Sequence, residues 1–275
     1  MAHLIRTSSS IFKIGNNIFG VKDQFTNTFS QSISGFSNPI AIGKDVGNNR
    51  IFVCNDGGSS ISVINLSTLT ITSTITGIPS PQCIAIDEVN NRFAVGSYGA
   101  SYVVIYNLTT FAVITTLTGY SNPQAVGWDI ANNHFFIAEY TSGTIKVFNA
   151  TTFEHITTIS GTNAVRQMAV DTANNRLFLT NAGTSTVLIV NLSSLAIIGS
   201  LSGSGVGISV DVVINRLLVA NGSSVRSYNL TSLGLVETIS GFGNANGLYS
   251  DGINNRFFIG DYNTNRVVIC NKIGS

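Results

Sequence analysis

The sequence predicts an all-β protein, a six-bladed β-propeller whose blades are four-stranded antiparallel sheets. Three observations lead to this prediction: one turn-like motif recurs six times, four strand-like segments fill each period, and the two chain ends are out of phase with the repeat. Self-similarity at a fixed period of about 20 to 50 residues is typical of a repeat architecture.

The recurring motif is an aspartate followed by asparagine and a basic residue. Its copies are DVGNNR, DEVNNR, DIANNH, DTANNR, DVVINR and DGINNR, which begin at Asp45, Asp87, Asp129, Asp171, Asp211 and Asp251. These aspartates are 42, 42, 42, 40 and 40 residues apart. A catalytic group is needed once per active site, whereas Asp and Asn suit every tight turn, because Asp accepts backbone N–H groups and Asn tolerates left-handed geometry. The motif therefore predicts a hairpin turn in each repeat.

Four segments of each period have the composition of β-strands. In the second period they are PQCIAID, RFAVGSY, YVVIYN and FAVITTLTG, which are rich in Val, Ile, Phe and Tyr and are separated by turn residues. The fourth segments end at Gly35, Gly77, Gly119, Gly161, Gly203 and Gly241. The third segments end at Asn65, Asn107, Asn149, Asn191, Asn229 and Asn271. Four antiparallel strands every 40 residues or so predict a propeller blade.

The chain ends predict how the ring closes. The last period stops after its third strand, Arg266 to Asn271, and the chain begins with an unpaired fourth strand, TFSQSISG, which ends at Gly35. The N-terminal strand is expected to complete the last blade and so to pair both exposed edges. Residues 25–275 are then a single propeller domain, and residues 1–24 form an N-terminal arm that docks into a larger assembly. The alternative is a degenerate partial blade in residues 1–24, which gives seven blades.

Two stretches, LFLTNAGTSTVLIVNLSSLAIIGSLSG and IFVCNDGGSSISVINLSTLTITSTITGIPSPQCIAID, resemble the YVTN-type β-propeller repeat. The shared features are an aromatic or aliphatic pair, a V/L-x-N tripeptide, an S-x-V-x-I/V-N strand, a Thr-rich return strand and a glycine. The resemblance covers residues 28–271, and the NHL-type six-bladed repeat is a close second. It implies a propeller fold and leaves the function open, because such propellers occur in surface-layer and cell-surface proteins and beside enzymes.

The composition disfavours two classes of partner. The formal net charge is +1, only 10% of the residues are charged, and no basic run is present, so neither nucleic acid nor insertion into a membrane is expected. The N-terminal residues lack an apolar segment long enough for a secretory signal, and no apolar run is long enough for a transmembrane helix. The expected location is cytoplasmic or within a virion or surface assembly.

The cysteines and the formal glycosylation sites both have structural explanations. Cys54, Cys83 and Cys270 lie in apolar strand-like segments without metal-binding spacing, so they are predicted to be buried small hydrophobic residues. Five N-x-S/T sequences begin at Asn65, Asn107, Asn149, Asn191 and Asn229. They occupy the equivalent turn of five repeats, and turn chemistry explains them without a glycan.

Function is expected on the opposite face from the constant turns, where the repeats differ from one another. Residues at the end of each second strand and at the start of each inner strand meet there around the axis. The predicted ligand-binding residues are Asn55, Gln82, Tyr98, Gln124, Glu139, Tyr140, Arg166, Asn181, Asn221, Asn246, Asp261 and Tyr262. Amides and aromatic faces suit neutral polar ligands such as sugars or peptide loops.

The predicted function is a non-catalytic propeller scaffold that binds a protein or a polar ligand such as a glycan, as a surface or virion component. The alternative is a metal-dependent hydrolase or lyase, in which Glu139 and Asp261 supply oxygen ligands to calcium. These two residues belong to the third and sixth repeats, on opposite sides of a six-bladed ring, so they are poorly placed to share an ion. No catalytic set and no cofactor are therefore predicted.

Overall fold

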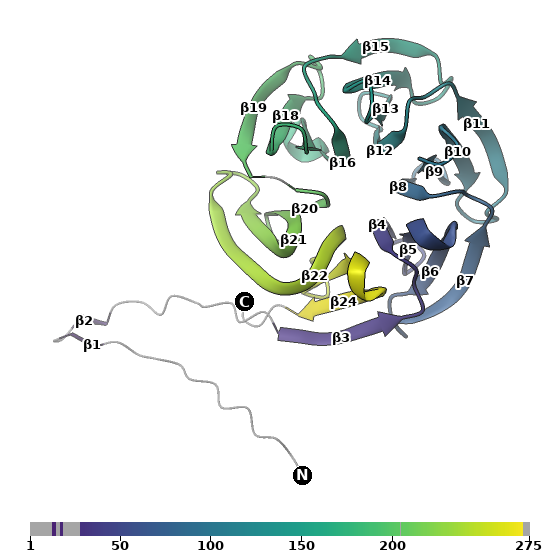
Figure 1. The fold of residues 1–275 in the computed structure, drawn as a ribbon. Coiled ribbons are helices and arrows are strands. Elements are labelled where there is room, and N and C mark those ends of the chain that lie inside the picture. The colour runs from purple at the N-terminus through teal and green to yellow at the C-terminus, as the bar shows by residue number, and fades with distance from the viewer. Residues whose placement is uncertain (1–12, 15–16, 19–27, 204, 272–275) are drawn as a thin grey trace.

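A computed structural model describes residues 13–14, 17–18, 28–203 and 205–271. The strands of residues 28–203 and 205–271 are arranged in a ring around a central axis (Figure 1). Three short 3-10 turns accompany the strands: η1 (Asp56–Gly58), η2 (Thr172–Asn174) and η3 (Tyr262–Thr264). In this part of the chain, no helix has the length and apolar character needed to cross a membrane.

Four of the blades are four-stranded antiparallel sheets in which the strands follow one another in chain order from the axis outward. The first contains β4 (Pro39–Asp45), β5 (Arg50–Asn55), β6 (Ser60–Asn65) and β7 (Thr70–Thr76). The second contains β8 (Pro81–Asp87), β9 (Arg92–Ser97), β10 (Tyr102–Asn107) and β11 (Val113–Thr118). The third contains β12 (Pro123–Asp129), β13 (His134–Glu139), β14 (Thr144–Asn149) and β15 (His155–Ile159). The fourth contains β16 (Val165–Asp171), β17 (Arg176–Asn181), β18 (Thr186–Asn191) and β19 (Ile197–Ser202).

The prediction of six four-stranded blades is wrong, because the ring has five blades and the last one is six-stranded. Its strands, in spatial order, are β20 (Ile208–Asp211), β21 (Arg216–Asn229), β22 (Leu235–Asp251), β23 (Arg256–Asp261), β24 (Arg266–Asn271) and β3 (Thr28–Ser34). Two sequence repeats therefore share one sheet. The seven-blade alternative is also wrong, since β1 (Lys13–Ile14) and β2 (Asn17–Ile18) form a separate two-stranded sheet. The remainder of the predicted arm lies outside the described residues, and its docking role stays a prediction.

A shortened loop explains why the last two repeats merge. Asn191 and Asn229 are 38 residues apart, whereas the preceding equivalent asparagines are 42 apart. The lost residues come partly from the segment that forms β21, a single continuous strand in which Gly222 adopts a φ of 58°. Gly222 pairs with Ala245 of β22, and Ala245 pairs on its other side with Asp261 of β23. The ladder thus continues from one repeat into the next.

The inner strands form a closed ring around the axis. β4 contacts β8, which contacts β12, and the sequence continues through β16 and β20 to the C-terminal part of β22, which contacts β4 again. The N-terminal strand closes the outer edge as expected, because β3 pairs antiparallel with β24. Buried aliphatic and aromatic side chains fill the space between neighbouring sheets, and Phe52, Phe93, Phe135 and Phe178 are completely buried at equivalent or adjacent positions.

The repeated Asp-Asn-Arg motif forms the predicted hairpin turn. In the fourth blade, Asp171 is buried and accepts hydrogen bonds from the backbone N–H and the Nδ2 of Asn174. Asn175 adopts a φ of 55°, the left-handed geometry that Asn tolerates. Arg176 Nη2 lies 2.7 Å from Asp171 Oδ2 and also donates to the carbonyl of Leu230 in the next repeat, at 2.8 Å. The motif therefore shapes a turn and ties adjacent repeats together.

The N-x-S/T sequences form the turn between the third and fourth strands of a repeat. Asn65 Oδ1 accepts hydrogen bonds from the N–H groups of Ser67 and Thr68, both at 2.9 Å. Ser67 Oγ accepts a hydrogen bond from Nδ2 of Asn49, in the neighbouring turn, at 2.7 Å. The Asn and the Ser of this sequence thus each have a structural role.

Candidate ligand-binding mouth

One face of the ring carries the loops that lead from the outer strand of one repeat to the inner strand of the next, and we call it the upper face. Here four inner strands share an irregularity at one equivalent position. In β8, Pro81 pairs with Ser97 and Cys83 pairs with Gly96, which leaves Gln82 as an extra residue between two rungs of the ladder. The same bulge occurs in β4, β12 and β16. A β-bulge re-aims the side chain that it carries, and bulges are frequent beside functional sites.

The bulged residues border a cavity of ≈ 550 Å³, which we call the axial mouth. Its size lies within the range of about 300 to 1,000 Å³ usual for ligand pockets. Its lining residues are Ile40, Asp56, Ser80, Gln82, Tyr98, Gln124, Tyr140, Arg166, Val206, Asn244, Asn246 and Tyr262. All six sequence repeats contribute, so the cavity exists only in the closed ring.

Two amide side chains of the axial mouth have no hydrogen-bond partner among the described residues. Gln124 is 7% exposed and Asn246 is 5% exposed, and both line the cavity. Gln82, by comparison, donates from Nε2 to the hydroxyl of Ser80 at 3.2 Å. The amide atoms of Gln124 and Asn246 are not fully buried, so they reach the solvent of the cavity and stay free to hydrogen-bond another molecule. Such groups are expected where a ligand supplies the missing hydrogen bonds.

Two charged side chains occupy different walls of the mouth. Arg166 lies with its guanidinium 5.2 Å from the centre of the Tyr140 ring, and its Nη2 makes only a long 3.4 Å contact with the Tyr140 hydroxyl. No carboxylate of the described chain forms an ion pair with Arg166. Asp56 accepts a hydrogen bond from the Tyr262 hydroxyl at 3.1 Å and another from the Ser80 hydroxyl. Burial, the nearby charge of Asp56 and the hydrogen bond between Tyr262 and Asp56 raise the pKa of Tyr262 above its ordinary value.

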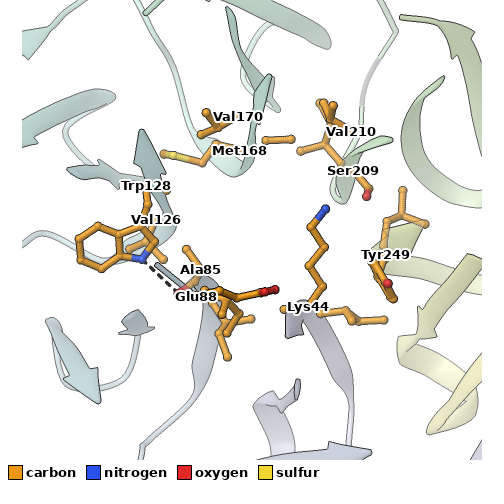
Figure 2. A pocket seen from close by; sticks show the side chains of 18 residues that line it. Lys44, Ala85, Glu88, Val126, Trp128, Met168, Val170, Ser209, Val210 and Tyr249 are labelled. Carbon is orange, nitrogen blue, oxygen red and sulfur yellow. Dashed lines mark hydrogen bonds between the residues drawn. The ribbon is translucent and has the colours of Figure 1, made fainter. Parts of the chain in front are cut away.

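The lower boundary of the mouth is a polar bridge followed by an apolar ring. Gln167 Nε2, on β16, donates across the axis to the backbone carbonyl of Ile40 on β4, at 2.9 Å. Below it, the lower channel has a volume of ≈ 250 Å³. Its upper ring of apolar residues consists of Ile42, Ile84, Val126, Met168, Ile208 and Leu248. Figure 2 shows this channel, with Lys44 extending toward Ser209 and Met168. A ligand would therefore enter the axial mouth from the upper face of the ring.

Seven of the twelve predicted site residues line the axial mouth, and five do not. Those in the mouth are Gln82, Tyr98, Gln124, Tyr140, Arg166, Asn246 and Tyr262. Those outside its lining are Asn55, Glu139, Asn181, Asn221 and Asp261. Four of the residues outside the lining end a second strand and Asn221 lies within β21, whereas those in the mouth are either at the bulge of an inner strand or directly after the end of a second strand.

The predicted residues outside the lining hold the backbone of the upper loops. Glu139 Oε1 accepts from the N–H of Ser121 at 2.8 Å, and Asn181 Oδ1 accepts from the N–H of Asn163 at 2.9 Å. Asp261 accepts from the N–H groups of Gly243 and Asn244, at 3.0 and 2.7 Å. Asn55 makes the weaker equivalent contact with Ser37, at 3.4 Å, and Asn221 is half-buried. In the four contacts with Ser37, Ser121, Asn163 and Gly243, the partner lies 18 residues earlier in the chain.

Five lining residues are absent from the predicted set: Ile40, Asp56, Ser80, Asn244 and Val206. Asp56 follows Asn55 directly and occupies the same repeat position as Tyr98, Tyr140 and Tyr262, so the repeat alignment contained the signal that it belongs to the mouth. Ser80 lies in the loop before β8, and Asn244 lies within β22, two residues before Asn246. Their distance from the axis depends on how each segment folds, and no pattern in the sequence indicates it.

The described residues contain no group of three or more His, Cys, Asp or Glu side chains arranged to hold a metal ion. Glu139 also pairs with Lys146 Nζ at 3.2 Å. The carboxylates of Glu139 and Asp261 are therefore both engaged with protein groups, and calcium binding at these residues stays a prediction of the alternative function.

The cysteine prediction is confirmed. Cys54, Cys83 and Cys270 are free and buried. Burial raises the pKa of Cys83 and of Cys270 to about 12, so both thiols stay protonated at neutral pH.

Comparisons with known proteins support the fold and leave the activity open. No protein-family model matches the chain, and no curated protein matches it. Among solved structures, the chain is similar to the β-propeller domain of Cps50 (Swd1) from Myceliophteria thermophila, with a TM-score of 0.68 and 9% sequence identity. The match covers 89% of this chain and 99% of that domain. At this identity the similarity confirms a β-propeller and nothing finer.

Proposed function

We propose that the protein is a non-catalytic binding scaffold whose axial mouth receives a polar ligand, either a glycan or a segment of another protein. One observation carries the proposal: Gln124 and Asn246 point nearly buried, unpartnered amides into a cavity of ≈ 550 Å³. Each amide offers both donors and an acceptor, so a ligand with several hydroxyl or amide groups satisfies both.

Three further features favour a ligand-binding role over a purely structural role for the residues that line the mouth. Tyr98, Tyr140 and Tyr262 surround the amides with aromatic surface, and Tyr98 is 39% exposed. Aromatic rings with polar tips are typical of surfaces that hold polar ligands. The rigid ring of strands places these side chains before a ligand arrives, which lowers the entropic cost of binding. The β-propeller fold is compatible with a scaffold role.

The test compares two cavity variants with the parent protein on immobilised glycan and peptide arrays. Gln124→Leu and Asn246→Leu keep most of the side-chain volume and remove the amides, so each is expected to weaken capture of the ligand by about tenfold or more, the loss of one or two hydrogen bonds. The matched control is Gln31→Leu, which changes an exposed glutamine on β3 and should leave capture intact.

Stability provides a second measurement for the same variants. Because the Gln124 amide makes no hydrogen bond to the described residues, Gln124→Leu removes no such bond from the folded protein and should leave the melting temperature unchanged. Weakened capture without loss of stability is the signature of a binding group. Capture that is equal for the parent and both cavity variants would contradict the proposal.

A further inference from the structure

The polar groups of the axial mouth lie at one level around its circumference. Gln82, Gln124 and Arg166 are the bulged residues of three consecutive inner strands, and Asn246 lies at the corresponding bulge of β22. The two remaining positions of this level carry Ile40 and Val206. Four of the six positions around the axis therefore present hydrogen-bonding side chains, with the apolar ring of the lower channel beneath them.

This distribution favours a ligand with polar groups around its whole perimeter. A pyranose ring carries hydroxyl groups in several directions, and each hydroxyl can donate and accept. An acidic amino-acid side chain that enters from a protein loop has its polar atoms at one end only. It would leave the amide of Asn246, on β22 and two inner strands away from Arg166, without a partner.

The charged groups narrow the ligand class further. Arg166 has no ion-pair partner in the described chain, and its guanidinium is held against the Tyr140 ring rather than by an acid. A guanidinium offers a planar pair of donors that matches both oxygens of a carboxylate. Asp56 belongs to the first repeat, across the ring from the fourth repeat that contains Arg166. The hydrogen bonds that Asp56 accepts from Tyr262 and Ser80 hold its carboxylate in place, where it can accept hydrogen bonds from the hydroxyl groups of a sugar.

We infer that the axial mouth binds a sugar acid, a hexuronic acid or a similar carboxylate-bearing saccharide, with its carboxylate on Arg166 and its hydroxyls on the amides of Gln124 and Asn246. This inference rests on the proposed binding function and specifies its ligand. The bridge from Gln167 to the Ile40 carbonyl closes the lower side, so the mouth accepts either the free monosaccharide or the terminal residue of a glycan chain.

Titration calorimetry on the full chain tests the inference with four ligands: sodium D-glucuronate, D-glucose, an oligosaccharide that ends in glucuronate, and a capped glutamate peptide. The parent protein is expected to bind glucuronate about tenfold more tightly than glucose, the value of a charge-assisted hydrogen-bond pair. The free acid and the oligosaccharide distinguish the two sources of the same ligand group, and binding of either supports the inference.

Two arginine variants identify the group that recognises the carboxylate. Arg166→Gln should reduce the affinity for glucuronate to that for glucose, and circular dichroism should show an unchanged fold. Arg266→Gln removes an exposed arginine that is absent from the lining of the mouth, and it should bind glucuronate as the parent does.

Three results would overturn the inference: equal affinity of the parent for glucose and glucuronate, unchanged glucuronate affinity in Arg166→Gln, or binding of the glutamate peptide without the sugar acids. In each case, ligand capture by the Gln124→Leu and Asn246→Leu variants on the arrays tests the broader proposal separately. If those variants lose capture of another ligand, the mouth is a binding site and only the ligand class is wrong. If no capture depends on the amides, the binding function fails as well.

Discussion

Residue His134 shows what the basic residue of the turn motif contributes, because its copy of the motif has histidine where the others have arginine. His134 Nδ1 lies 3.8 Å from Asp129 Oδ2, too far for a hydrogen bond, and it is buried without a partner in the described part of the chain. The arginines of the first, fourth and sixth repeats instead reach a backbone carbonyl of the next repeat, that of Leu108, Leu230 and Leu66 respectively. The third repeat lacks this connection to the fourth.

Replacing His134 by arginine is expected to stabilise the protein by about 1 kcal/mol, since it restores the ion pair with Asp129 and a hydrogen bond toward the equivalent carbonyl of Leu192. Urea unfolding measures the change. Arg176→His makes the reverse substitution in the fourth repeat and should destabilise the protein. A lower stability of His134→Arg than of the parent would show that the clamp between repeats is not the role of this residue.

At the scale of the element, β3 closes the ring by pairing with β24. Arg266 pairs with Ser34, Val267 with Ile33 and Val268 with Ser32, so successive side chains of β3 alternate between the two faces of the sheet. Ile33 is 8% exposed and packs in a cluster with Phe36, Val267 and Ile269, whereas Ser32 is exposed. The first and last parts of the chain are thereby joined through one apolar contact surface.

Ile33→Asp is expected to destabilise the protein by at least about 3 kcal/mol, because it buries an unpaired carboxylate at the closing strand. Ser32→Asp introduces the same side chain one residue earlier, on the exposed face, and should change the stability by less than about 0.5 kcal/mol. Thermal melting followed by circular dichroism compares them. Similar melting temperatures of the two variants would mean that closure by β3 does not contribute to stability.

At the scale of the whole molecule, the contacts between sheets bury several groups that ionise only at alkaline pH. Burial and the proximity of Tyr102 raise the pKa of Tyr106 to about 12, and burial and the charge of Glu139 raise that of Tyr120 to about 12. The buried thiols of Cys83 and Cys270 behave in the same way. The unfolded chain releases these protons at lower pH than the folded chain does.

The free energy of unfolding should therefore decrease as the pH rises. The contribution of these groups is fully present below their ordinary pKa values, 9.0 for the thiol and 10.0 for tyrosine, and is lost progressively as the pH approaches 12. Urea unfolding at a series of pH values measures the slope. Tyr106→Phe removes one ionising group and should make the decrease above pH 10 shallower. A stability that is constant from pH 8 to 11 would contradict this explanation.

Part of the axial mouth could be predicted because a repeat places equivalent residues at equivalent positions. Alignment of the repeats was enough to select Gln82, Gln124, Arg166 and Asn246 at the start of the inner strands, and the structure places all four in the cavity. The same alignment also selected Glu139 and Asn181, whose side chains hold loop backbones instead. Both sets lie at the upper end of a strand, and only the bulge in the inner strand decides which of them faces the axis.

The sequence by itself determined the all-β class, the positions of the Asp-Asn-Arg and N-x-S/T turns and the closure of the ring by an N-terminal strand, because these depend on local turn chemistry and on a periodic pattern. The tertiary structure alone decided the number of blades and the depth of the site. Two sequence repeats merged into one six-stranded blade since a shortened loop allowed Ala245 to pair on both sides. Gln124 and Asn246 became unpartnered amides in a cavity because inner strands distant in the chain converge on one axis, a relation that no single repeat contains.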